Sequence, residues 1–459
     1  MKKIFPQSLS NFCKLLLLAV CLQANFVAKA QLGDLLKTVK DVKKGTEDVK
    51  KTVTEAQRTL NEIQQFRNEV RELQSIIKTT TGFNENVKVA NGNTPNSKEA
   101  VMEAKMSGAK LEIKDGKATN LAWEYTAYFD NQLFPSTLIS MATYKGTLTP
   151  ELQAIKSSAL GFVFYSSLPA MAVKWEIECS EEKYFKKQSG TYICEKAKQL
   201  YYFMPELGWN YSLLSKQETR TNIQVTFRVF DEKGNKEEYP VTLALRSVND
   251  CIRFYKDTDL RFMYAAYVNE EHPEIDKILR EGLNTKITDT WIGYQGTERD
   301  VLLQVAAIWK ALHNRKFTYS SISANSGDEG DVKSQSVRTF DKAIKTSQAN
   351  CVDGTVVFAS ILKKIGIKPV IILVPGHCFL GFYSDANKTK LNFLETTQLS
   401  NKDVINPKTK KVEKNAFIEA MVAGTMAYEE AIQKYPNNIQ KIDLEEARQK
   451  VKPLPVSNN

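Results

Sequence analysis

Histidine is scarce in this chain of 459 residues, which contains only three: His272, His313 and His377. No H-E-x-x-H motif and no cluster of histidine and cysteine occurs, so the sequence does not predict a metal enzyme. A glycine-rich phosphate-binding loop is also missing. We therefore expect no metal and no other cofactor, and chemistry that needs a histidine has very few candidates.

Long hydrophobic runs are lacking as well, since no segment reaches the roughly 20 apolar residues that span a bilayer. At the N-terminus, two lysines precede a short apolar core at residues 15–22, and an A-x-A tripeptide ends at Ala30. This pattern is typical of a secretory signal peptide over residues 1–30. We expect export from a bacterial cell, to the periplasm or the medium, with no membrane span. The alternatives are an uncleaved anchor and lipid attachment at Cys21, although Val20 stands where a small residue is expected.

Neither sign of charge dominates, because 63 Lys and Arg face 53 Asp and Glu, a net charge of +10. Four of the lysines belong to the predicted signal peptide, which leaves +6 of this +10 spread over the mature chain. A spread charge of this size favours solubility and predicts no nucleic-acid partner. A hydrophobic content of 42% excludes a disordered chain. At roughly 100–200 residues per domain, we expect two or three domains.

Seven cysteines are present, and two of them lie in the predicted signal peptide. The other five are Cys179, Cys194, Cys251, Cys351 and Cys378. An odd number in an oxidising compartment leaves at least one thiol free, and such a thiol is a candidate reactive group. Cys179 and Cys194 end two strand-like runs, so one interpretation is a disulfide between them, and two buried thiols are the other.

The mature chain begins with a heptad pattern. Over residues 35–77, apolar or neutral residues recur at alternating steps of four and three, and no proline interrupts them. The pattern predicts a coiled-coil helix over residues 31–80 that forms a homo-oligomer through residues 35–77. The alternative is one amphipathic helix that lies on the chain's own domain. Polar residues then predict a linker over residues 81–110.

Two further regions follow. Short alternating runs separated by turn residues occupy residues 111–250, and they predict an antiparallel β-sandwich with a binding or spacing role. From residue 251 to residue 459, helical and strand-like patterns alternate, which predicts an α+β domain that holds the candidate chemistry. The expected fold class of the whole chain is α+β.

Cys351 has the sequence context of a nucleophile. Asn350 is a favoured N-cap residue, and Gly366 is a stop signal at the end of the apolar stretch that follows. Cys351 would then lie on the first turn of a helix, where unpaired N–H groups and the helix dipole favour a thiolate. The thiolate is the form of cysteine that attacks a carbonyl carbon.

A predicted hairpin supplies a base and an acid. Residues 369–374 are wholly apolar and predict a strand buried on both faces, and residues 377–383 and 390–395 flank a turn-prone tract. If the hairpin is symmetric about Ala386, His377 and Glu395 face each other on one side of the sheet. Directly opposed residues have Cβ atoms roughly 4.5–5.5 Å apart, which allows a hydrogen bond between imidazole and carboxylate. A slip of one residue would place the two on opposite faces.

Three motifs resemble those of one enzyme family. They are Cys351-Val352-Asp353-Gly354, Gly376-His377-Cys378-Phe379 and Phe393-Leu394-Glu395-Thr396-Thr397. Together they resemble the transglutaminase-like superfamily of papain-related cysteine enzymes, in an exported bacterial branch, over about residues 301–455. The resemblance implies a triad of Cys351 as nucleophile, His377 as base and Glu395 as orienting acid. It also implies a protein or peptide substrate and an acyl-enzyme resolved by water or by an amine.

The chain departs from the family pattern at two positions. Glu395 is one methylene longer than the Asp that the family often has, and Ala349-Asn350 stands where a glycine commonly precedes the nucleophile. The backbone N–H of Cys351 is one expected oxyanion donor, and Gln348 is a candidate for the second, its alternative being a solvated loop residue. Cys378 would face away from His377 into the core, and Asp353 would be a carboxylate at the helix N-terminus.

A non-enzymatic interpretation also fits the sequence. The heptad segment and the predicted sandwich are typical of an envelope scaffold or adhesion protein that oligomerises and only binds peptides. The three motifs favour the enzyme, and the two N-terminal regions favour the scaffold.

Overall fold

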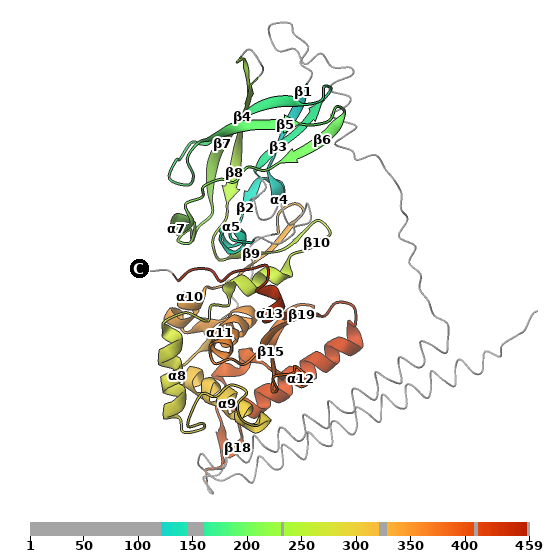
Figure 1. Cartoon of the computed structure of the whole chain (residues 1–459). Helices are drawn as coiled ribbons and strands as arrows, with labels where there is room; N and C mark the ends of the chain where they lie inside the picture. The colour runs from blue at the N-terminus through green and yellow to red at the C-terminus, as the bar shows by residue number, and fades with distance from the viewer. Residues whose placement is uncertain (1–120, 145–159, 231–233, 321–327, 408–411, 457–459) are drawn as a thin grey trace, which may run out of the picture. The chain divides into compact units, whose positions relative to one another are not determined.

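The computed structural model describes residues 121–144, 160–230, 234–320, 328–407 and 412–456 (Figure 1). The predicted signal peptide, coiled coil and linker lie outside these residues. The described chain is mixed α+β, as the sequence predicts, with several separate sheets. None of its helices is long and apolar enough to cross a membrane.

The chain divides into two compact units, and each is assembled from separate segments. The β-rich unit contains the described residues of Lys88–His272, Ser320–Thr346 and Ile442–Asn459. The helix-rich unit contains those of Pro273–Tyr319 and Ser347–Lys441. This division differs from the boundary that the sequence places after residue 250. The reason is that a strand within Ser320–Thr346 pairs with the strand that begins at residue 250.

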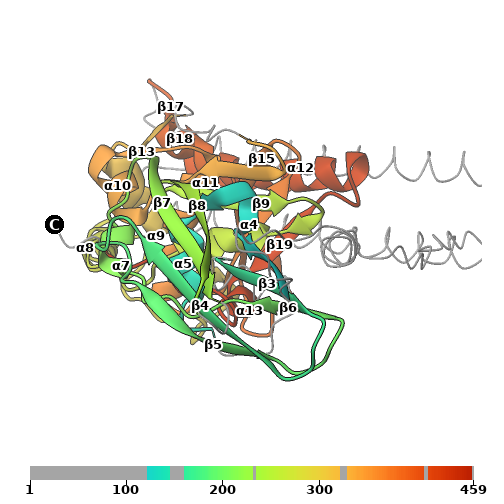
Figure 2. The same ribbon diagram turned by 90° about the horizontal axis from the view of Figure 1, so that it is seen from above.

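Two sheets with one shared core form most of the β-rich unit. The five-stranded sheet has the order β2-β8-β7-β4-β5, in which β4 lies between β5 and β7 (Figure 2). The three-stranded sheet has the order β1-β3-β6. The bounds are β1 Leu121–Thr126, β2 Gln132–Leu133, β3 Gly161–Ser166, β4 Met171–Cys179, β5 Gln188–Cys194, β6 Gln199–Phe203, β7 Thr221–Phe230 and β8 Lys236–Leu245.

Alternation of apolar and polar residues explains these sheets. In β4 and β7 every second side chain is buried, since successive side chains of a strand point to opposite faces. Buried residues of both sheets form one hydrophobic cluster, with Trp123 and Phe162 from the smaller sheet and Trp175 and Phe227 from the larger. The rings of Phe162 and Phe227 meet edge to face at 5.7 Å.

The disulfide suggested for Cys179 and Cys194 is not formed, because both side chains are free thiols. Strands β4 and β5 are antiparallel, and Cys194 is paired with Met171 at the start of β4, whereas Cys179 ends that strand. Eight residues of extended strand, at about 3.3 Å each, separate the two positions. Both cysteines are buried, so the alternative of two core thiols is correct.

The remaining elements of the β-rich unit are short. A small antiparallel sheet has the order β10-β9-β12. The bounds are α4 Tyr128–Asn131, α5 Pro135–Met141, α7 Tyr211–Leu214, β9 Asp250–Tyr255, β10 Thr258–Asp259, η1 Arg261–Tyr267, β12 Val332–Ser336, α10 Phe340–Thr346 and α13 Leu444–Ala447.

In the helix-rich unit, helices surround a sheet with the order β16-β15-β14-β19 (Figure 1). The helices are α8 Glu274–Asn284, α9 Glu298–Asn314, α11 Cys351–Lys364, η2 Thr396–Ser400 and α12 Ala416–Lys434. The sheet strands are β14 Pro369–Val374, β15 His377–Tyr383, β16 Leu391–Leu394 and β19 Gln440–Asp443. Two small ladders join β11 Thr318–Tyr319 to β13 Gln348–Ala349, and β17 Val404–Ile405 to β18 Val412–Lys414.

The centre of this sheet is apolar. Strand β14 lies where the sequence predicts a strand buried on both faces, and five of its six residues are buried. Helix α12 packs on the sheet through Tyr428, whose ring stacks on Phe393 of β16 at 4.2 Å. Helix α11 contacts β14 and β15. Helix α11 therefore lies against the strand that begins with the predicted histidine, and α12 against the strand that ends just before the predicted acid.

Candidate functional site

Cys351 is the first residue of helix α11, as the sequence predicts. Asn350 is the N-cap: its Oδ1 accepts a hydrogen bond from the N–H of Asp353 at 2.9 Å, and Asp353 Oδ2 accepts one from the N–H of Asn350 at 3.0 Å. This reciprocal capping box fixes the start of the helix. The helix ends at Lys364, and Gly366 follows with a φ of +79°. Cys351 thus lies at the positive end of the helix dipole and is only partly buried.

A tight turn places His377 at the start of its strand. Val374 of β14 pairs with His377 of β15, so the connection consists of Pro375 and Gly376 alone. Gly376 has a φ of +75°, which glycine adopts at little cost. The ring of His377 is therefore positioned by the edge of a buried hairpin, and its side chain remains one-third exposed.

The imidazole meets the predicted acid. His377 Nε2 lies 2.6 Å from Glu395 Oε2. Cys351 is close enough to His377 to raise the pKa of the imidazole, so the structure brings the three predicted side chains into one neighbourhood. Because the carboxylate occupies Nε2, Nδ1 is the ring nitrogen left for the sulfur.

The strand register differs from the prediction by two residues. Leu380 pairs with Leu394 and Tyr383 with Leu391, which centres the hairpin on Asn387 rather than Ala386. The turn explains the shift, since the Asp385 carboxylate accepts hydrogen bonds from the N–H groups of Asn387, Thr389 and Lys390 and organises a longer loop.

Glu395 consequently lies just beyond β16, as the N-cap of η2, and it is not the direct partner of His377 in the ladder. A shift of two residues keeps a side chain on the same face of a sheet, and so the contact with His377 survives.

The Glu395 carboxylate is buried and held on both oxygens. Oε1 accepts hydrogen bonds from the backbone N–H and the hydroxyl of Thr397, at 3.0 and 2.6 Å, and Oε2 faces His377. The backbone N–H of Glu395 donates to the carbonyl of Ala420 in α12, at 3.0 Å. The acid therefore has a fixed orientation, which in turn fixes the imidazole.

Two glycines allow helices to approach the segment that carries the acid. A Cβ on Gly424 of α12 would lie 2.9 Å from the backbone nitrogen of Leu394 and 3.1 Å from that of Glu395. A Cβ on Gly354 of α11 would lie 2.8 Å from Thr396 Oγ1. Any larger residue would have to displace this segment, so both glycines are required by close packing.

Electrostatics favour a protonated imidazole. The neighbouring Cys351 and the hydrogen-bonded carboxylate of Glu395 raise the pKa of His377 from 6.5 to about 10, although burial of the ring opposes them. Burial would raise the pKa of Glu395, but the hydrogen bonds from His377 and Thr397 outweigh it and lower this pKa below 4.5. The pair thus carries an imidazolium and a carboxylate at neutral pH.

The other described cysteines differ sharply from Cys351. Cys179, Cys194, Cys251 and Cys378 are all buried, and burial raises the pKa of each thiol, to about 11 for Cys194. Cys378 is a core residue, as expected, and its pKa is raised further by the neighbouring Cys351. Of the described cysteines, only Cys351 is accessible enough to react with a solute.

Three residues near this site were not assigned a role from the sequence. Tyr319 is 52% exposed, and its pKa is raised by burial of the phenol oxygen and then by Cys351 and Glu395. Thr397 binds the acid, and a Thr two residues after a carboxylate is a common local hydrogen-bonding pattern. An isolated glycine inside a helical pattern, as at Gly424, is itself a signal of close packing.

Gln348, the candidate second oxyanion donor, is exposed on β13, three residues before Cys351. The Nδ2 atom of Asn350 is buried without a hydrogen-bond partner. Among the described residues, no group of three or more His, Cys, Asp or Glu side chains could hold a metal ion.

Comparison of the chain with protein-family models, curated proteins and solved structures found no significant match. The function is therefore argued from the site itself.

Proposed function

We propose that the chain is an exported cysteine enzyme that attacks amide bonds of a protein or peptide through an acyl-enzyme. Cys351 is the nucleophile, His377 the base, and Glu395 the acid that orients the imidazole. One observation carries the proposal: His377 Nε2 lies 2.6 Å from Glu395 Oε2, and Cys351, at the start of α11, is the neighbour that most strongly raises the pKa of the same imidazole. A nucleophile, a base within hydrogen-bond reach and a third group that orients the base are the signature of covalent acyl transfer.

Acylation begins from the form in which His377 already holds the proton of the Cys351 thiol, and the sulfur attacks the amide carbon. A C–S bond forms, and the carbonyl oxygen takes up negative charge. The Asp353 N–H is used by the capping box, but the N–H of Cys351 lies at the start of α11, where the helix provides no acceptor, so it is suited to bind this oxygen. His377 then returns the proton to the leaving nitrogen, the C–N bond breaks, and a thioester and an amine result.

Deacylation repeats these steps in reverse order. His377 takes a proton from water or from a primary amine, the new nucleophile attacks the thioester carbon, and the C–S bond breaks. Water gives a carboxylic acid, the reaction of a protease or amidase. An amine gives a new amide, the reaction of a transglutaminase. No redox step and no cofactor enter this scheme.

The proposal extends to the architecture. An α+β unit with a cysteine at a helix start and a histidine on an adjacent hairpin supports a transglutaminase-like domain, and two sheets with a shared core support a β-sandwich. The signal peptide over residues 1–30 and the oligomerising coiled coil over residues 35–77 remain proposals from the sequence. They imply a periplasmic or extracellular enzyme carried on a stalk.

Alkylation of the full chain tests the nucleophile. Iodoacetamide is added at pH 6, and peptide mass spectrometry measures the modification of every cysteine separately. We expect Cys351 to react at least about tenfold faster than free cysteine, of which little is thiolate at this pH. The four buried thiols are internal controls. His377→Gln should abolish the advantage of Cys351, while its circular dichroism spectrum stays unchanged.

The scaffold interpretation predicts a different result. If Cys351 reacts as slowly as Cys378, or if His377→Gln leaves its rate unchanged in folded protein, the enzymatic proposal is wrong. Incubation of a glutamine-containing protein with a fluorescent primary amine then separates the two reactions. Fragments indicate hydrolysis, and label in intact substrate indicates transamidation.

A further inference from the structure

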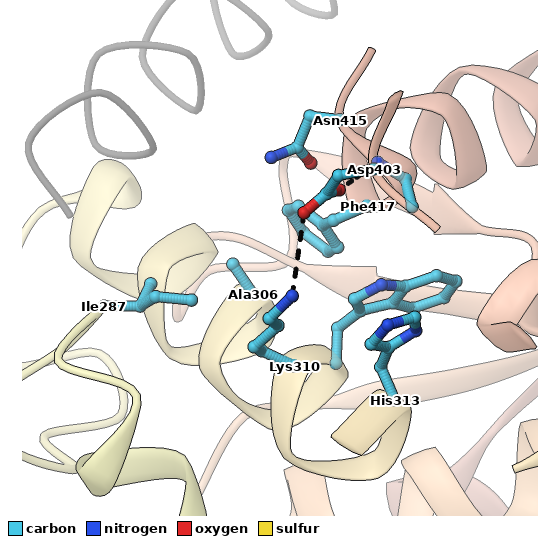
Figure 3. Close-up of a pocket in the computed structure, with 9 residues that line it drawn as sticks. Ile287, Ala306, Lys310, His313, Asp403, Asn415 and Phe417 are labelled. Carbon is cyan, nitrogen blue, oxygen red and sulfur yellow. Dashed lines mark hydrogen bonds and ion pairs between the residues drawn. The ribbon is translucent and has the colours of Figure 1, made fainter. Parts of the chain in front are cut away.

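A pocket of the helix-rich unit lies between α9 and the N-terminus of α12, and it is called the α9–α12 pocket below (Figure 3). It is partly open to solvent and has a cavity volume of about 60 Å³, which is room for a few ordered waters or for one small polar or apolar group. None of the three triad residues lines it, so it is distinct from the site described above.

The inner wall of the pocket is apolar. Trp309 and Phe417 line it, their ring centroids are 6.0 Å apart, and both side chains are almost fully buried. Ala306 lies one turn before Trp309 and Lys310 on α9, and its small side chain leaves room between the two helices. This wall is suited to an apolar group.

Two opposite charges face each other at the pocket. Lys310 extends from α9 toward Asp403, with Nζ 3.6 Å from Asp403 Oδ2 (Figure 3). This distance exceeds the roughly 2.7–3.2 Å of a direct hydrogen bond, so the two ions attract each other without a hydrogen bond. Asp403 Oδ1 accepts the backbone N–H of Ala416 at 2.9 Å and caps α12. One carboxylate oxygen is thus structural, and the other retains its capacity to accept hydrogen bonds.

His313 adds a third polar group, one turn after Lys310 on the same helix face. Its Nδ1 lies 3.0 Å from the carbonyl oxygen of Leu399. A carbonyl only accepts hydrogen bonds, so Nδ1 donates to it, and Nε2 is the ring nitrogen left to interact with a ligand. The pocket therefore combines a cation, a carboxylate oxygen and an imidazole nitrogen beside an apolar wall.

We propose that the α9–α12 pocket binds an α-amino acid with an apolar side chain. The ligand's carboxylate accepts hydrogen bonds from Lys310, its ammonium group donates to Asp403 Oδ2 and His313 Nε2, and its side chain packs on Trp309 and Phe417. A ligand with only one charge would separate the ion pair and satisfy only one of its members, which is costly at a partly buried pair. This inference does not depend on the proposed triad.

Calorimetry on the full chain tests the ligand class with three related probes. L-Phenylalanine carries both charges, 3-phenylpropanoate lacks the ammonium group, and 2-phenylethylamine lacks the carboxylate. We expect L-phenylalanine to bind at least about tenfold more tightly than either of the others, because each lost charge-assisted hydrogen bond costs about a factor of ten or more. Glycine should bind more weakly than L-phenylalanine, since it lacks the apolar group.

Matched variants locate the binding. Lys310→Met should weaken L-phenylalanine binding at least about tenfold while the affinity for 2-phenylethylamine changes little. Asp403→Asn keeps an oxygen to cap α12 and should weaken binding to the same extent. Ala306→Leu fills the pocket and should abolish binding. Lys434→Met is the control, because Lys434 is an exposed lysine that does not line the pocket and pairs with Glu430 on α12.

Two outcomes would overturn the proposal. One is that no probe binds at millimolar concentration to protein whose thermal unfolding shows it to be folded. The other is that 3-phenylpropanoate or 2-phenylethylamine binds as tightly as L-phenylalanine, which would indicate a purely apolar pocket or a simple ion site. Because calorimetry does not require turnover, Cys351→Ser should leave binding intact. The binding experiment can therefore succeed or fail whether or not the chain is an enzyme.

Discussion

Replacement of Glu395 by Gln should lower the pKa of His377. Two partners raise this pKa from 6.5 to about 10, Cys351 with the larger effect and Glu395 with the second, and burial acts against them. The glutamine side chain would be similar in shape to the native acid and could still accept the hydrogen bonds of Thr397, but it carries no charge. We therefore expect the imidazole to lose part of its stabilisation as a cation without a change in the fold.

The size of the effect follows from the position of the ring. The carboxylate is 2.6 Å from Nε2 and only 7% exposed, whereas the imidazole is 33% exposed and is therefore partly screened by water. Loss of one of two strong partners should lower the pKa by at least about one unit, or about 1.4 kcal/mol. Cys351→Ser should lower it more. The double variant should fall to 6.5 or below, because burial alone disfavours the charged ring.

Nuclear magnetic resonance can measure these values directly, since the chain has only three histidines. Spectra of the ring nitrogens across pH 5–11 should show one imidazole that stays protonated to about pH 10 in the wild type. The signal is assigned by its absence in His377→Gln. A wild-type pKa near 6.5, or a value unchanged in both single variants, would refute the claim that Cys351 and Glu395 together hold the imidazole protonated.

Two further predictions concern the support of the site. Gly424→Ala should destabilise the chain by about 1–3 kcal/mol, because its Cβ would meet the backbone of Leu394 and Glu395. It should also reduce alkylation of Cys351 at pH 6, whereas Glu430→Ala, at an exposed position of the same helix, should do neither. The second prediction is that unfolding free energy contributed by His377 is fully present below pH 6.5 and is lost as the pH rises through about 10, since the folded pKa is raised. With screening at the one-third exposed ring, we expect a loss of about 2 kcal/mol over this interval. Chemical denaturation of the wild type and His377→Gln measures it, and equal slopes for the two proteins would contradict the shift.

Local signals predicted local structure well. Asn350 and Gly366 mark the two ends of α11, and the apolar stretch of β14 coincides with the observed strand, because caps and burial patterns act over a few residues. The pairing of strands that are distant in the sequence was harder to predict. The pairing of β12 with β9 joins residues about eighty positions apart, and the sequence of neither strand indicates which strand it pairs with. The suggested link between Cys179 and Cys194 failed for the same reason, since strand ends do not reveal which of them are adjacent.

The contact between His377 and Glu395 shows what sequence reasoning can fix and what it cannot. The predicted hairpin was centred on Ala386, and its register was wrong by two residues. The hydrogen bonds from the loop to the Asp385 carboxylate, which set the observed register, could not be foreseen. The prediction of the face was nevertheless correct, since side chains alternate with a period of two and an even shift preserves their side. Glu395 then reaches the imidazole from just beyond the end of β16, where Thr397 and the close approach of Gly424 hold it. A glutamate is one methylene longer than the Asp expected from the family pattern, and a diagonal position beyond the ladder is farther from the ring than a directly opposed one. The longer side chain is therefore what this register requires, so Glu395→Asp should weaken the contact with His377 even though it conserves the charge.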